Sequence, residues 1–275
     1  MRSTGDQIGT RCLPAAMHRL ATRVSENSVL IARTIERRAA VIACAWATTM
    51  AIAAGLRIAT STMPVHTLTD LVQMALPYAF IVLAPITGYL LASASFPAGH
   101  ALPQPAVRLA RIGTWRRLTP DEARARPKFG PSGFLASLLI GLLLSIALRG
   151  WEFAIAMPAL NHHAPIWGYG LFRIMALDVA VTAFFYAACL AMALRAAPLF
   201  PRMLLFTWLC DITMQLGIAS VVASLEPVPT AVAAPLSVLL TANIHKVLIS
   251  IAVWLPFLVL SERVNVTYRL RTARR

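Results

Sequence analysis

Four ionisable side chains lie inside apolar stretches that are long enough to cross a membrane. They are Asp178, Asp211, His245 and Lys246. An ionisable group within a membrane span costs about 2.5–3.5 kcal/mol on insertion scales, so it is retained where it pairs with another group or handles a proton or an ion. Together with Gln215, these residues form the candidate intramembrane polar or ion-pair site.

Further polar residues recur at four-residue spacing around these charges. The lines they form are Asp178, Thr182 and Tyr186; Thr207, Asp211 and Gln215; Thr241 and His245; and, beside the last, Asn243, Lys246 and Ser250. Residues four apart share one helix face, so three helices are expected to turn polar faces toward one another.

Two hypotheses account for these polar faces. In the first, hydrogen bonds and an ion pair fix the register of the helices, with Asp178 and Lys246 as the expected pair because they lie at similar depth. In the second, the faces line a path for protons or a solute in a small transporter or channel. Lys246 also has an inert interpretation, since a lysine stem can carry its amine to the membrane surface.

The composition identifies the class of protein. Hydrophobic residues make up 58% of the 275 residues and charged residues 13%, with a mean hydropathy of +0.69. A soluble domain contains about twice that charged fraction. The net charge is +14, but the basic residues flank the apolar stretches, as in membrane proteins. The expected partners are therefore the lipid bilayer and other membrane proteins, with no nucleic acid.

Six segments approach the roughly 20 mostly apolar residues that a spanning helix needs. They are 39–59, 71–95, 132–149, 171–194, 203–225 and 236–260. The sequence therefore predicts an all-α fold, a polytopic transmembrane helical bundle with six spans. The segment WEFAIAMPAL (151–160) is too short to span, and we expect it to lie flat at the membrane surface.

Arginine and lysine are unevenly distributed between the loops. Seven precede the first span, seven lie in 96–131, two in 195–202 and five after 261, whereas the other side has Arg57, Arg149 and Arg173. Cytoplasmic loops carry the excess of positive charge, so both termini are predicted to be cytoplasmic in a bacterial inner membrane.

The chain divides into five segments by these criteria. They are a basic cytoplasmic N-terminal segment (1–38), a two-span front section (39–95), a basic cytoplasmic linker (96–131), a four-span section (132–261) and a basic cytoplasmic tail (262–275). Apolar residues near helical spacing between Met17 and Ile35 fit either a surface-lying amphipathic helix or a frayed basic tail. In the linker, TPDE (119–122) predicts a capped helix that ends near Arg126.

The end of the sixth span carries a recognisable pattern. It reads Trp254-Leu255-Pro256-Phe257, then Ser261-Glu262-Arg263-Val264, then Thr267-Tyr268. The pattern resembles the closing signature of a bacterial multi-pass membrane family, domain of unknown function 2569, in which Trp-x-Pro-Tyr is followed by Ser-x-Arg-Val and Thr-Phe. The motif residues carried over are Trp254, Pro256, Ser261, Arg263, Val264 and Thr267.

Two shorter pieces extend this resemblance over about 129–270. The stretch GPSGFL (130–135) resembles the glycine-rich start of the family, and LFPR (199–202) resembles its Phe-Pro turn. The resemblance implies a four-helix unit and brings no established activity. Phe257, Tyr268 and Phe134 stand where the family usually has Tyr, Phe and Trp, which puts any role of a hydroxyl at position 257 in doubt.

Motifs for catalysis and metal binding are not found in the sequence. There is no G-x-S-x-G, H-E-x-x-H, P-loop or dinucleotide-binding pattern. The spacing of the cysteines fits neither a zinc site nor a disulfide framework. Adjacent His162 and His163 point in different directions on regular structure and make a poor metal pair. We therefore expect no catalytic residue, metal or cofactor, and a non-enzymatic accessory or scaffold component of the membrane.

Overall fold

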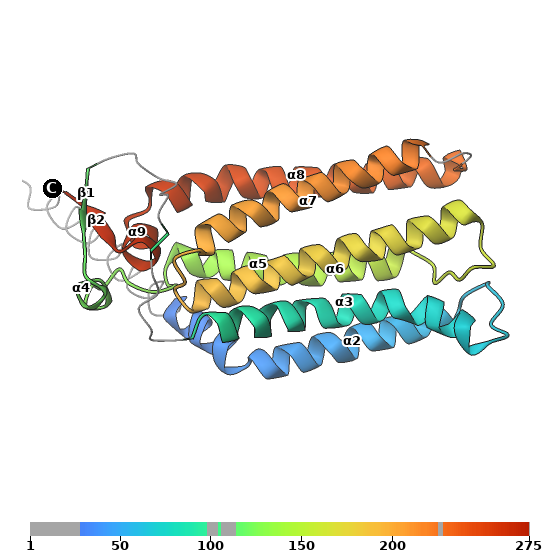
Figure 1. Ribbon diagram of the computed structural model, residues 1–275, viewed down its shortest axis with the longest axis horizontal. Coiled ribbons are helices and arrows are strands. Elements are labelled where there is room, and N and C mark those ends of the chain that lie inside the picture. The colour runs from blue at the N-terminus through green and yellow to red at the C-terminus, as the bar shows by residue number, and fades with distance from the viewer. Residues whose placement is uncertain (1–27, 98–103, 106–113, 225–227, 275) are drawn as a thin grey trace, which may run out of the picture.

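Six long helices form the protein in the computed structural model, which describes residues 28–97, 104–105, 114–224 and 228–274. Their bounds are α2 Ala39–Ala59, α3 Leu68–Ser95, α5 Phe134–Ala156, α6 Ile166–Leu194, α7 Phe200–Ser224 and α8 Thr230–Leu260. All six are long and apolar enough to cross a membrane. The predicted all-α, six-span bundle is confirmed (Figure 1).

The third span is longer than the sequence analysis predicted. The expected flat surface segment at 151–160 is wrong for its first half, because α5 continues through Trp151 and Glu152 to Ala156. Arg149 therefore lies within the helix rather than at its end. The charges at 149 and 152 are compatible with a span because both form ion pairs, described below.

Helix α6 is the centre of the bundle. Apart from the polar line of Asp178, Thr182 and Tyr186 it is mostly apolar, and it has 18 buried residues, as expected for a helix enclosed by others. Helices α3, α5 and α7 contact it, whereas α2 packs on α3 and α5, and α8 packs on α7. Gly88 of α3 lies against the backbone of α6, where an added Cβ would lie 2.3 Å from the carbonyl oxygen of Phe184.

A small cap of linker and tail lies beyond one end of the spans (Figure 1). Strand β1, Trp115–Arg117, pairs antiparallel with β2, Arg271–Ala273, with Trp115 opposite Ala273. The short helices α4, Pro120–Arg124, and α9, Glu262–Arg269, complete the cap. The predicted capping box is confirmed, since Thr119 and Glu122 exchange side chain to backbone hydrogen bonds.

The described start of the chain lies at the same end as this cap. Residues 28–37 are helical, and the Ser28 hydroxyl accepts a hydrogen bond from the Gly133 amide. The remainder of the predicted surface helix, from Met17 to 27, lies outside the described residues. The connections 60–67 and 157–165 lie at the opposite end of the bundle (Figure 1).

Candidate functional site

Arg149 of α5 is the centre of a polar cluster inside the bundle. Its guanidinium lies 3.4 Å from Asp178 Oδ2 on α6, forms an ion pair with Asp211 on α7, and donates to the Thr182 hydroxyl at 3.2 Å. The Tyr186 hydroxyl donates to Asp211 Oδ2 at 2.9 Å. One cation thus connects two carboxylates from different helices, both almost completely buried.

A chain of amides extends the cluster to α8. Gln215 Nε2 donates to Asp178 Oδ2 at 2.8 Å, and Asn243 Nδ2 lies 3.5 Å from Gln215 Oε1. Lys246 donates to Asn243 Oδ1 at 3.3 Å and forms an ion pair with Glu152 of α5. The polar groups of four helices are therefore joined by hydrogen bonds from Tyr186 to Glu152.

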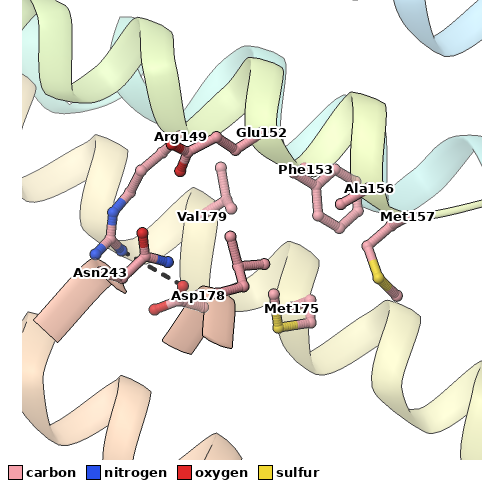
Figure 2. Close-up of a pocket in the computed structure, with 10 residues that line it drawn as sticks. Arg149, Glu152, Phe153, Ala156, Met157, Met175, Asp178, Val179 and Asn243 are labelled. Carbon is pink, nitrogen blue, oxygen red and sulfur yellow. Dashed lines mark hydrogen bonds and ion pairs between the residues drawn. The ribbon is translucent and has the colours of Figure 1, made fainter. Parts of the chain in front are cut away.

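A small cavity lies beside this cluster, between α5, α6 and α8 (Figure 2). Arg149, Asp178 and Asn243 line its polar side, while Phe153, Met157, Met175 and Leu239 are among its apolar lining. Its volume of about 10 Å³ has room for about one water molecule. Asp178 Oδ1 makes no hydrogen bond within the described part of the chain.

The structure brings together most of the predicted site residues, with different partners. The expected pair of Asp178 and Lys246 does not form: Asp178 contacts Arg149 and Gln215, and Lys246 contacts Glu152. The physical reason is that α8 packs on α7, so the α7 amide of Gln215 lies between the α6 carboxylate of Asp178 and Asn243 of α8.

Two of the predicted polar lines also differ from expectation. His245 and Thr241 are exposed on the surface of α8, and His245 does not join the cluster. Thr207 is buried, but its hydroxyl donates to the Met203 carbonyl and contacts the Cys189 thiol at 3.3 Å. Only Asp211 and Gln215 of that line contribute to the cluster.

Sequence reasoning missed Arg149 and Glu152, the two charged residues of α5 in the cluster. Both were assigned to the membrane surface, because the third span was ended at Arg149. The signal that could have found them is the apolar stretch Phe153–Ala156, which continues the helical pattern beyond both charges. With this extension, the two residues fall inside a helix that is long and apolar enough to span a membrane.

The second group of predicted residues, the C-terminal motif, forms a junction between the bundle and the cap. The Arg263 guanidinium donates to the Ser132 hydroxyl, and the Gly130 amide donates to Thr267 Oγ1 at 3.0 Å. The Phe134 ring lies 4.7 Å from that of Trp254 and 5.0 Å from that of Phe257. Two of the three stretches that carry the family resemblance thus meet at the start of α5.

Tyr268 joins the third stretch to this junction. Its ring lies 4.9 Å from that of Phe200, and its hydroxyl donates to the Ala193 carbonyl at 3.1 Å. Burial raises the pKa of the Tyr268 phenol above its usual value, so the group remains a neutral donor. Val264 of the same helix is fully buried. Pro256 lies within α8, and Ser261 is the residue at which α8 ends. These contacts indicate a structural role for the motif.

Gly133 precedes the first residue of α5, has a positive φ and lies close to the Arg263 side chain. Its φ of +67° and ψ of −140° are strained for any residue with a Cβ, and an added Cβ would lie 3.4 Å from Arg263 Nε. Gly133→Ala is expected to lower the free energy of unfolding by about 1–3 kcal/mol. The thermal unfolding midpoint of the detergent-solubilised protein measures this.

Gly141→Ala in the same helix is the matched control. Nothing lies within 4 Å of its added Cβ, and alanine is favoured over glycine in a helix, so the midpoint should stay or rise. Equal midpoints for the two variants would contradict the assignment of strain to Gly133.

Fold and site together define the class of this chain: a multi-pass α-helical membrane protein with a buried charged cluster across α5, α6, α7 and α8. No family model, no curated protein and no solved structure matches the chain.

Proposed function

We propose that the protein is a non-enzymatic accessory or scaffold component of a bacterial inner membrane, with both termini in the cytoplasm. We further propose that residues 129–270 belong to the membrane family whose closing signature they resemble. The observation that carries the functional proposal is that the three most buried intramembrane charges, Arg149, Asp178 and Asp211, are paired with one another. The distribution of basic residues supports the orientation, since the arginine-rich linker and tail form the cap at one end of the bundle.

The closed geometry favours a structural role for the charges. The Arg149 side chain is 10% exposed, and those of Asp178 and Asp211 are 2% and 1% exposed. The adjoining cavity has a volume of about 10 Å³, which holds about one water molecule, whereas solute passage needs a continuous polar route. Hydrogen bonds and ion pairs between four helices fix their register, as the first hypothesis from the sequence expects.

One observation favours the second candidate function, a proton-handling transporter or channel. The cluster contains the carboxylates of Asp178, Asp211 and Glu152 but only two cations, Arg149 and Lys246. One bound proton would neutralise the formal excess of one negative charge. Asp178 Oδ1, which lacks a hydrogen-bond partner among the described residues, is the oxygen that would carry it.

Proton flux distinguishes the two functions. The full-length protein is reconstituted into liposomes that contain a pH-sensitive dye, and a pH gradient and a membrane potential are imposed. We expect the flux to equal that of protein-free liposomes, and Asp178→Asn to leave it unchanged. Flux that Asp178→Asn abolishes, and that Thr213→Val (an exposed α7 residue outside the cluster) retains, would replace the accessory role by proton handling.

A second arm tests the accessory role directly. Photoreactive side chains are placed in native membranes at Val238 and Ile249 of α8, which are 69% and 64% exposed, with buried Val247 as control. We expect a discrete cross-linked species with another membrane protein from the exposed positions and none from Val247. Adducts with lipid alone would contradict the accessory role.

A further inference from the structure

Three side chains that are far apart in the sequence meet at the end of the bundle opposite the cap. Asp70 lies in the first turn of α3, and His162 and His163 lie in the connection between α5 and α6. One ligand atom from each residue lies within 4.8 Å of the other two. The imidazole ring centroids are 4.0 Å apart.

The distances from Asp70 to the two histidines match those between ligands of one small metal ion. Asp70 Oδ1 lies 3.3 Å from His162 Nδ1 and 3.4 Å from His163 Nε2. Zinc binds imidazole nitrogen and carboxylate oxygen at about 2.0–2.2 Å in tetrahedral sites, which places neighbouring ligand atoms about 3.3–3.5 Å apart. Both separations agree with this value.

Asp70 is held so that one oxygen is directed at the two imidazoles. Its Oδ2 accepts hydrogen bonds from the amides of His66 at 3.0 Å and Thr67 at 2.8 Å, the latter as part of the capping box of α3. Its Oδ1 accepts no hydrogen bond within the described part of the chain, and the residue is 1% exposed. A buried, unpartnered carboxylate oxygen therefore faces two nitrogen ligands.

The connection that carries the histidines is fixed by its own contacts. The Asn161 side chain donates from Nδ2 to the Pro64 carbonyl at 2.8 Å. Its Oδ1 accepts a hydrogen bond from the backbone amide of His163 at 3.1 Å. Gln73 Oε1 accepts from the His162 amide at 3.0 Å and lies 2.9 Å from His162 Nδ1. The adjacent histidines converge because residues 157–165 form no regular structure, unlike the arrangement expected from the sequence.

We propose that Asp70, His162 and His163 bind one divalent transition-metal ion of the zinc class. Two imidazoles and one carboxylate form a three-residue ligand set that this class of ion prefers, and the fourth position is available to water or to Gln73 Oε1. The bound ion would connect the start of α3 to the connection between α5 and α6. The proposal is independent of the proposed function.

Metal titration of the full-length protein in nanodiscs tests the site. The protein is purified without a histidine tag, stripped with a chelator and titrated with Zn²⁺ against a chromophoric competitor. We expect one ion per chain. We also expect the intense visible absorption of tetrahedral Co²⁺ when Co²⁺ is bound in place of zinc. Stoichiometric binding should raise the thermal unfolding midpoint, because the three ligands are brought together only in the folded state, which therefore binds the ion more tightly.

Asp70→Asn is the most informative variant. The amide oxygen can still accept the backbone hydrogen bonds of the capping box, but the negatively charged ligand is lost. We expect Asp70→Asn and His163→Ala each to weaken Zn²⁺ binding about 100-fold or more, since loss of even an indirect partner of a metal ligand costs about 10–100-fold. The unfolding midpoint without metal shows whether each variant folds.

His66→Ala is the matched control. The His66 ring lies edge-on to His163 at 6.2 Å between centroids, yet it is not among the three residues whose ligand atoms converge. This variant should keep its affinity and its Co²⁺ absorption. The proposal is overturned if the unmodified protein binds Zn²⁺ no more tightly than Asp70→Asn, or if His66→Ala loses as much affinity as His163→Ala.

Discussion

Arg149→Met is expected to lower the free energy of unfolding by about 3–5 kcal/mol, the range observed when one partner of a buried ion pair is removed. Methionine is similar in length to arginine, so the variant removes the charge and leaves little cavity. Asp178 and Asp211, whose side chains are 2% and 1% exposed in the unmodified protein, then lack the cation that pairs with both. Loss of the charge, rather than loss of packing, is the cause.

Replacing both aspartates by asparagine should largely restore the free energy of unfolding that Arg149→Met loses. In the combined variant Arg149→Met, Asp178→Asn and Asp211→Asn, no charge is left unpaired, and replacement of a buried ion network by neutral groups is often close to neutral in energy. Recovery in the combined variant identifies the cluster as a structural unit. A combined variant no more stable than Arg149→Met alone would contradict the ion-pair explanation.

Cys189 provides the measurement for these variants. Its side chain is completely buried in α6, whereas Cys44 of α2 is exposed. In a background with Cys12, Cys44 and Cys210 replaced by serine, a thiol-reactive fluorophore labels Cys189 only when the bundle opens. The temperature of half-maximal labelling in detergent then reports the stability of the helices around the cluster.

The second large effect is expected at Gly88, where α3 lies against the backbone of α6. An added Cβ would lie 2.3 Å from the Phe184 carbonyl oxygen and 3.1 Å from its Cα. These are backbone atoms, so no side chain can rotate away, and the two helices must separate. Gly88→Val is therefore expected to cost about 3 kcal/mol, at the upper end of typical overpacking effects.

Two further variants show that the effect arises from backbone contact. Gly217 is exposed on α7, and nothing lies within 4 Å of an added Cβ, so Gly217→Val should change the labelling temperature little. Truncation of the neighbouring side chain in Gly88→Val with Phe184→Ala should not restore stability. Restoration would show that the obstacle is the Phe184 ring and not the backbone.

Features that depend on neighbouring residues along the chain were predictable from the sequence. Hydropathy located all six spans, since apolar length is a local property, and for the same reason the Thr119 capping box was recognised in advance. Asp178, Asp211 and Gln215 were correctly placed on inward-facing helix surfaces, because four-residue spacing determines which residues share a face.

The partners of these residues were decided by tertiary structure alone. Whether Asp178 meets Lys246 or Arg149 depends on which helices touch and in what register, and α5 rather than α8 supplies the cation. Asp70 is separated from His162 by most of two helices, so nothing in their spacing links them. The sequence by itself determined the spans and the inward positions of Asp178, Asp211 and Gln215; helix packing decided which charges meet, because pairing is set by contacts between distant segments.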